Sequence, residues 1–221
     1  MPQAKSKPEA SVSVIGSQLF QPLADLIGHM VARPYQKSDQ VSSNYYEGGY
    51  STAIILALAV AVESMVARDR YFHRRAHGHE GLPVPEYMRK VHRYRYYVRL
   101  SELFVLRDAI VHNHVWKLCY VYRPQGSRRL VSALRVSWSG NGRLKKRLNP
   151  KDLRTKLLRA NVIPVRMDRK DVLKAFDVAH GVFTFLSKRG AKPVHITEGI
   201  VGFRGELLPF SKLRAKLLAT L

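Results

Sequence analysis

Acidic residues and cysteine are scarce in this chain of 221 residues. Sixteen Asp and Glu stand against 38 Lys and Arg, so the formal net charge is +22. Because this charge repels itself in a compact protein, it favours a polyanionic partner, with nucleic acid the first candidate and an anionic membrane surface the second. The single cysteine, Cys119, excludes an intramolecular disulfide and a cysteine-rich zinc site, and we expect it to be a small buried residue in a reducing compartment.

Long apolar runs are also absent. Residues 54–62 are very apolar, but Glu63 and then Arg68 interrupt them well short of the roughly 20 residues that a membrane span needs. Residues 1–16 lack the apolar region of a signal peptide. We therefore expect a cytoplasmic protein with no membrane segment. The chain also contains no Walker loop, no dinucleotide-binding glycine fingerprint and no G-x-S-x-G elbow.

The hydrophobic pattern predicts a mainly helical protein. Hydrophobic residues make up 46% of the chain, and in several segments they recur at spacings of three and four, as on one face of a helix. Helices are expected over residues 11–33, 51–73, 85–112, 149–159, 169–188 (ended by Gly190) and 212–221, and a β-hairpin over about 116–139. The domain plan is a flexible tail (1–10), a helical domain with the hairpin inserted (11–188) and a basic C-terminal extension (189–221).

The segment between the first two expected helices is polar. Residues 34–50 are expected to form a loop that turns at Gly48 and Gly49. Ser51 or Thr52 can then cap the next helix, because a hydroxyl at this position accepts a hydrogen bond from the first helical turn.

The most informative stretch is Ser101–Trp116, where an apolar helix ends in a base, an acid and two imidazoles. Arg107 and Asp108 are followed closely by His112 and His114. An arginine binds phosphate oxygens through two parallel N–H groups, and the ordinary pKa of histidine lets it move protons near neutral pH. These residue types at this spacing suit phosphodiester chemistry.

Each of the four side chains has a role in RNA cleavage without a metal ion. His112 can act as general acid or base, and Arg107 can bind the phosphate and stabilise its developing charge. Asp108 can orient the imidazole or the guanidinium, and His114 can carry a second proton. The structural alternative is that Arg107 and Asp108 form a surface pair while the histidines cap the end of the helix.

The hexapeptide RDAIVH (107–112) resembles the R-(polar)-x-x-x-H signature of HEPN domains, small all-helical modules many of which are metal-independent endoribonucleases. Asn113 fits the usual context, and Ser51–Tyr71 resembles the family's earlier core helix, with Glu63 as its lone acid. The resemblance covers roughly residues 10–115. It implies an HEPN-like helical bundle and RNA products with a 2′,3′-cyclic phosphate. It also implies no cofactor, and a toxin or antiviral effector that is controlled by an antitoxin or sensor protein.

Glu63 is the only charged residue between Ser51 and Ala67. An unpaired buried carboxylate is costly, so we expect Arg107 to pair with it and be held in place; a carboxylate that reaches solvent is the alternative. At about 100° per residue, Arg107 and His112 lie about 140° apart around a regular helix. They share a site only if the helix ends near His112 or a second copy contributes, and the resemblance implies the second, a homodimer.

Two basic stretches predict an RNA-binding groove. Residues 87–99 interleave Lys and Arg with tyrosines, and residues 109–151 hold ten Lys or Arg and no Asp or Glu, which suits single-stranded RNA. The candidate RNA-binding residues are Arg89, Lys90, Arg93, Arg95, Arg99, Arg128, Arg129, Lys145, Lys146 and Arg147. A metal site at His73, His77, His79 and Glu80 is a weaker hypothesis, because nothing distant completes a tetrahedral set of ligands.

Two other functions compete with a nuclease. One is a non-catalytic RNA-binding module that keeps the basic groove, and the other is a basic assembly subunit whose charge meets an acidic protein. RNA affinity that falls steeply with salt favours RNA as the partner, because released counterions set that slope.

Overall fold

The computed structural model describes residues 15–36, 46–73, 77–112, 116–122, 128–135, 146–149, 151–190 and 199–221. Helices dominate these residues, as the sequence predicts, and three two-stranded antiparallel sheets accompany them. The helices are α1 (Ile15–Gln18), α2 (Phe20–Val31), α3 (Tyr46–Phe72), α4 (Val84–His92), α5 (Tyr97–Val111), α7 (Arg169–Arg189) and α8 (Leu213–Leu218). The strands are β1 (Trp116–Tyr122), β2 (Arg128–Arg135), β3 (Leu148–Asn149), β4 (Arg154–Thr155), β5 (Ile200–Phe203) and β6 (Glu206–Pro209).

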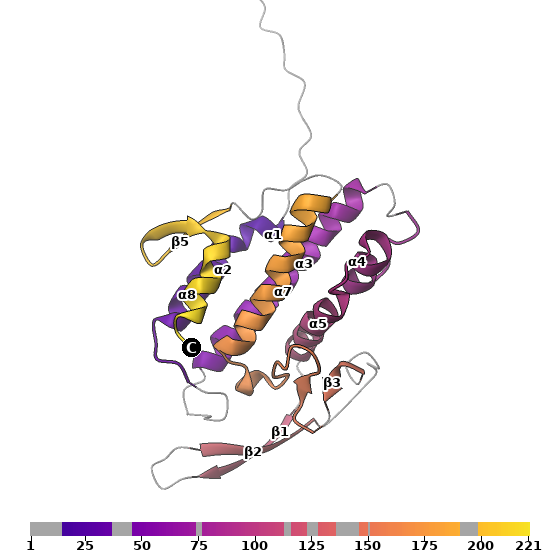
Figure 1. The fold of residues 1–221 in the computed structure, drawn as a ribbon. Coiled ribbons are helices and arrows are strands. Elements are labelled where there is room, and N and C mark those ends of the chain that lie inside the picture. Colours follow the sequence, from indigo (N-terminus) through magenta and orange to yellow (C-terminus); the bar gives the residue numbers. More distant parts are fainter. Residues whose placement is uncertain are drawn as a thin grey trace, which may run out of the picture.

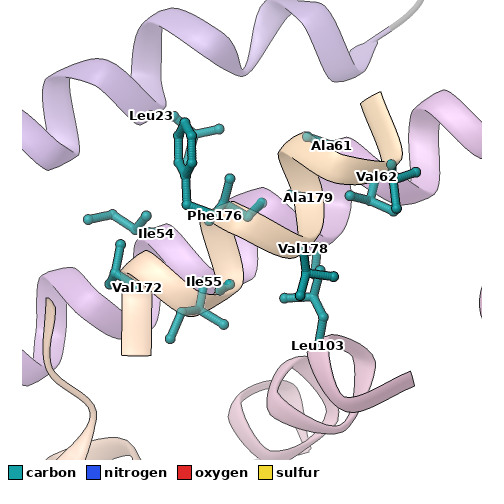
Figure 2. Close-up of a cluster of buried hydrophobic side chains, with 14 of the residues drawn as sticks. Leu23, Ile54, Ile55, Ala61, Val62, Leu103, Val172, Phe176, Val178 and Ala179 are labelled. Carbon is teal, nitrogen blue, oxygen red and sulfur yellow. The ribbon is translucent and has the colours of Figure 1, made fainter. Parts of the chain in front are cut away.

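The central helix of the bundle is α3. It lies beside α7, with α2 and α8 on one side and α4 and α5 on the other (Figure 1). Figure 2 shows side chains from α2, α3, α5 and α7 meeting in one core, among them Leu23, Ile55, Leu103 and Phe176, all of which are buried. Packing against several helices explains why α3 is apolar on most sides, although Val60 and Glu63 remain exposed.

By length and composition, α3 is also the one described helix that is apolar enough to cross a membrane. Half of its most apolar window is buried inside the chain. The core helix of a soluble protein meets the same criterion, so α3 is only a weak indication of a membrane segment.

The predicted turn at Gly48 and Gly49 is wrong, because α3 already begins at Tyr46 and both glycines lie within it. Gly48 serves a close approach instead: a Cβ at this position would lie 3.2 Å from the carbonyl oxygen of Pro164. Ser51 and Thr52 are therefore not caps. The Thr52 hydroxyl donates to the carbonyl of Gly48 within the helix.

The predicted helix over 85–112 is two helices, α4 and α5. Arg93 takes a left-handed conformation (φ 53°) directly after α4. The N–H of Arg93 then donates to the carbonyl of Arg89, and the N–H of Tyr94 donates to that of Met88, so these two bonds close the end of the helix. Glycine normally occupies this position, so an arginine there gave no signal in the sequence.

The predicted helix over 149–159 is also wrong, since β3 and β4 form a small hairpin there. Polar side chains fold the segment back on itself: Asn149 accepts from the N–H of Lys151, and Asp152 accepts from that of Arg154. Such local bonds offer the backbone an alternative to a helix. The buried Glu102 of α5 fixes the following turn, as described below.

The C-terminal residues belong to the same core as the bundle. Phe210 is 1% exposed and stacks on Phe20 of α2 and Phe176 of α7, with ring centroids 4.2 Å and 5.1 Å away. β5 and β6 form a hairpin before it, which the sequence did not predict. The expected terminal helix over 212–221 is shorter, and α8 ends at Leu218.

Three other predictions are confirmed in whole or in part. The β-hairpin over 116–139 is confirmed by β1 and β2, which project from one end of the bundle (Figure 1). The helix over 169–188 and its end at Gly190 are confirmed by α7. The first helix ends before Pro34 as expected, but Leu19 separates α1 from α2.

Replacing Asp168 with alanine should destabilise the fold by about 1 kcal/mol. Asp168 precedes α7, and its carboxylate accepts from the N–H groups of Lys170 and Asp171 and from the Tyr35 hydroxyl. The free energy of unfolding in urea measures the effect. Asp168→Asn is the matched control, because asparagine caps a helix as well as aspartate and should retain most of the stability. Equal losses in both variants would contradict the capping role.

Candidate functional site

The last turns of α5 place Arg107 against two carboxylates. Its Nη1 donates to Oε2 of Glu63 on α3 at 3.0 Å, while Nε and Nη2 donate to Oδ1 of Asp108 at 3.0 Å and 2.8 Å. The expected pairing of Glu63 with Arg107 is confirmed. The Glu63 side chain is 49% exposed, so the carboxylate also reaches solvent, which was the alternative to a buried pair.

These contacts keep the guanidinium charged and fixed. Burial alone would lower the pKa of Arg107, but the hydrogen bonds and charges of Asp108 and Glu63 outweigh burial and raise it. Three of its five N–H groups bond to these two acids. Arg107 is therefore a pre-oriented cation, and the described residues leave part of its donor set for a ligand.

Arg107 lines an open pocket of about 590 Å³ between α4 and α5. One wall is apolar and aromatic, with Pro83, Pro85, Tyr97 and Phe104. The guanidinium of Arg107 lies 4.8 Å from the centre of the Phe104 ring. The volume falls within the range of about 300–1,000 Å³ that is common for ligand sites.

Three further cations line this pocket, Arg89 from α4 and Lys146 and Arg147 from the segment before β3. None of the three forms an ion pair with a described residue. Three acids line the same pocket: Arg107 engages Glu63 and Asp108, and Glu86 is the third. The guanidinium of Arg89 lies 5.2 Å from the centre of the Tyr97 ring. Cations from separate parts of the chain thus converge beside an apolar wall, an arrangement that suits a phosphate attached to a flat base.

His112 is not one of the residues that line this pocket. It follows the last residue of α5 and is exposed. Its N–H donates to the carbonyl of Asp108. Within one chain the structure therefore brings together Arg107, Asp108 and Glu63, and leaves His112 at the end of the helix.

The remaining predicted site residues are spread over several elements. Lys90 is exposed on α4 and Arg93 is exposed in the turn after it. The two guanidiniums of Arg95 and Arg99 lie 4.5 Å and 5.7 Å from the ring centre of Tyr96. Arg128 and Arg129 belong to β2, while His114 and Lys145 lie outside the described residues.

Two other expectations concern cysteine and histidine. Cys119 is exposed on β1, which corrects the expectation of a buried residue, since the hairpin projects from the helical core. His73 packs edge-on against His92 at 4.9 Å, and His77 pairs with Glu80 at 3.5 Å on the surface. Among the described residues no three His, Cys, Asp or Glu side chains are placed to hold a metal ion.

The sequence missed the apolar wall of the pocket. Pro83 and Pro85 line the site beside Phe104. Only Tyr97 could be linked to the site from the sequence, because it is one of the tyrosines within the basic segment 87–99. Searches against models of protein families, curated proteins and solved structures found no match to this chain.

Proposed function

We propose that the protein is a metal-independent endoribonuclease of the HEPN type that acts on RNA at the Arg107 pocket. The observation that carries this proposal is the pairing of Arg107 with Glu63 and Asp108 at the edge of a pocket lined by three cations without ion-pair partners in the described chain. A fixed guanidinium that keeps part of its donor set suits a phosphodiester, whose charge grows during cleavage.

In the proposed reaction two protons move, one bond from phosphorus to the 2′-oxygen forms, and one bond from phosphorus to the 5′-oxygen breaks. The 2′-oxygen of the RNA attacks the adjacent phosphorus and gives its proton to a base, and the bond from phosphorus to the 5′-oxygen breaks as that oxygen takes up a proton. The products are a 2′,3′-cyclic phosphate and a 5′-hydroxyl. His112 supplies the base or the acid, and Arg107 stabilises the extra negative charge on the phosphoryl oxygens.

A homodimer supplies the geometry that one chain lacks. His112 of one chain lies outside its own Arg107 pocket, so a second copy has to bring its α5 end to the same phosphate. A dimer of HEPN type, with two Arg107 and two His112 side chains facing each other, meets this requirement. An unregulated ribonuclease would harm its own cell, so the proposal includes a toxin or antiviral role in the cytoplasm and a controlling antitoxin or sensor.

A non-catalytic RNA-binding module is the second candidate. The same pocket and the net charge of +22 support it, and the exposed position of His112 outside the pocket favours it over a nuclease if the protein is monomeric. It differs from the nuclease in one outcome: RNA binds and is not cut.

RNA affinity should fall steeply with salt, and the pocket cations should account for part of the slope. Removing Arg89 and Arg147 together should lower the slope of log K against log salt by about 1.4, because each phosphate contact to single-stranded RNA contributes about 0.7. Fluorescence anisotropy with a labelled single-stranded oligonucleotide at several salt concentrations measures it.

Lys188→Ala is the matched control, since Lys188 is exposed near the end of α7 and does not line the pocket. Its slope should equal that of the wild type. Weak RNA binding with no effect of the pocket change would instead favour an assembly subunit with an acidic protein partner.

A further inference from the structure

A second, smaller pocket lies on another side of α5. Its volume is about 330 Å³, it shares no lining residue with the Arg107 pocket, and α7 forms one of its walls. Three groups that donate hydrogen bonds line it: the Tyr94 hydroxyl, the Arg99 guanidinium and the Lys174 ammonium. Asp177 also lines it, but both oxygens of that carboxylate accept from Arg214.

Tyr94 is the most unusual of these groups. Its side chain is 5% exposed, and its hydroxyl donates to none of the described residues. Burial raises the pKa of Tyr94, so the hydroxyl keeps its proton and remains a donor. The ring is buried but the hydroxyl opens onto the pocket, so a ligand atom can accept its hydrogen bond in place of water.

Gly181 leaves this hydroxyl accessible. It lies in the middle of α7, where alanine would form a better helix. A Cβ at Gly181 would lie 3.4 Å from the Tyr94 hydroxyl oxygen, in contact with it. A side chain at this position would narrow the approach of a ligand to the hydroxyl.

The other walls are fixed by a buried acid. Glu102 is fully buried on α5, and its carboxylate accepts from the N–H groups of Leu157 and Leu158, two residues that line the pocket. Leu157 is nevertheless 56% exposed at the surface. The pocket therefore combines a rigid apolar wall with donors on the opposite elements, which is the usual composition of a small-molecule site.

The charges around the pocket favour an anion. Arg99 forms no ion pair with a described residue, and Lys174 uses two of its three N–H groups, on the carbonyl of Arg159 and on Asp171. At the same pocket, Tyr96 is 42% exposed and lies against the guanidiniums of Arg95 and Arg99. Phosphate oxygens suit the three donors, and a base suits the exposed aromatic ring.

We propose that the pocket of Tyr94, Arg99, Lys174 and Gly181 binds a nucleotide, with its phosphate on the three donors and its base against Tyr96 and the leucine wall. The nucleotide is either a free mononucleotide or one unit of a bound RNA strand. The site is separate from the Arg107 pocket, so it does not depend on the proposed nuclease activity.

The test compares wild type with Gly181→Ala and Tyr94→Phe. Isothermal titration with 5′-AMP reports the free nucleotide, and anisotropy with a single-stranded oligonucleotide reports the strand. Both variants should weaken binding of at least one of these ligands about tenfold, while the Tm of Gly181→Ala stays the same or rises. Loss of AMP binding identifies a mononucleotide site, and loss confined to the oligonucleotide identifies a unit of RNA.

Gly49→Ala is the matched control, because Gly49 lies in α3 with no atom within 4 Å of its Cβ position. It should leave both affinities unchanged. Arg107→Ala removes the contribution of the Arg107 pocket, and adding Tyr94→Phe to it should weaken the remaining AMP binding about tenfold, which separates this site from the proposed nuclease. Wild-type affinity for both ligands in Gly181→Ala and Tyr94→Phe would overturn the proposal, and so would the absence of any binding to the wild type.

Discussion

RNA cleavage should fall about 10²–10⁴-fold when His112 is replaced with alanine, because the change removes the proposed proton carrier. Binding should change little, since His112 does not line the pocket that holds the cations. Single-turnover cleavage of a labelled single-stranded RNA gives the rate, and anisotropy with the same RNA gives the affinity.

His77→Ala is the control, as His77 is exposed and lies in the turn after α3. It should cleave at the wild-type rate. A mixture of His112→Ala and Arg107→Ala chains should regain part of the activity, because a mixed dimer keeps one intact side chain of each kind. A His112→Ala protein that cleaves like the wild type would remove the imidazole from the mechanism.

Replacing Arg169 with alanine should lower the free energy of unfolding by about 3–5 kcal/mol. Arg169 is 1% exposed and donates through its side chain to both oxygens of Glu47 and to the carbonyls of Met30 and Arg33. The variant leaves a buried carboxylate without its cation, which is the costly way to break such a pair. Unfolding in urea, followed by circular dichroism, measures the loss.

Two further variants separate charge from packing. Arg214→Ala removes a cation from an exposed pair with Asp177 and should cost less than about 1 kcal/mol. The double change Glu47→Met with Arg169→Met removes both charges and should be less damaging than Arg169→Ala alone. A small effect of Arg169→Ala would mean that this pair does not hold α3, α7 and the end of α2 together.

The sequence predicted the parts of the fold that depend on local pattern. α3, α7 and the β1–β2 hairpin follow from apolar periodicity, β-branched residues and the glycine at 190. The pairing of Glu63 with Arg107 could be predicted because burying an unpaired carboxylate costs free energy, so a lone acid in an apolar helix needs a cationic partner.

The missed features depend on contacts between distant residues. α3 begins at Tyr46, where two glycines indicate a loop. The contact that holds its first turn is distant in sequence, because Arg169, 122 positions from Glu47, binds the Glu47 carboxylate in the core. Arg93 ends α4 in a conformation that glycine usually takes. The apolar wall of the Arg107 pocket forms only when α4 packs on α5, so no spacing in the sequence could reveal it.

The most direct test of the nuclease proposal is cleavage of labelled transfer RNA and a single-stranded oligonucleotide by the purified wild type in excess EDTA. The account predicts cleavage without added metal, with 2′,3′-cyclic phosphate ends on the products. Tight RNA binding without cleavage, in a protein that sedimentation shows to be a dimer, would contradict it and leave the RNA-binding module as the function of the Arg107 pocket.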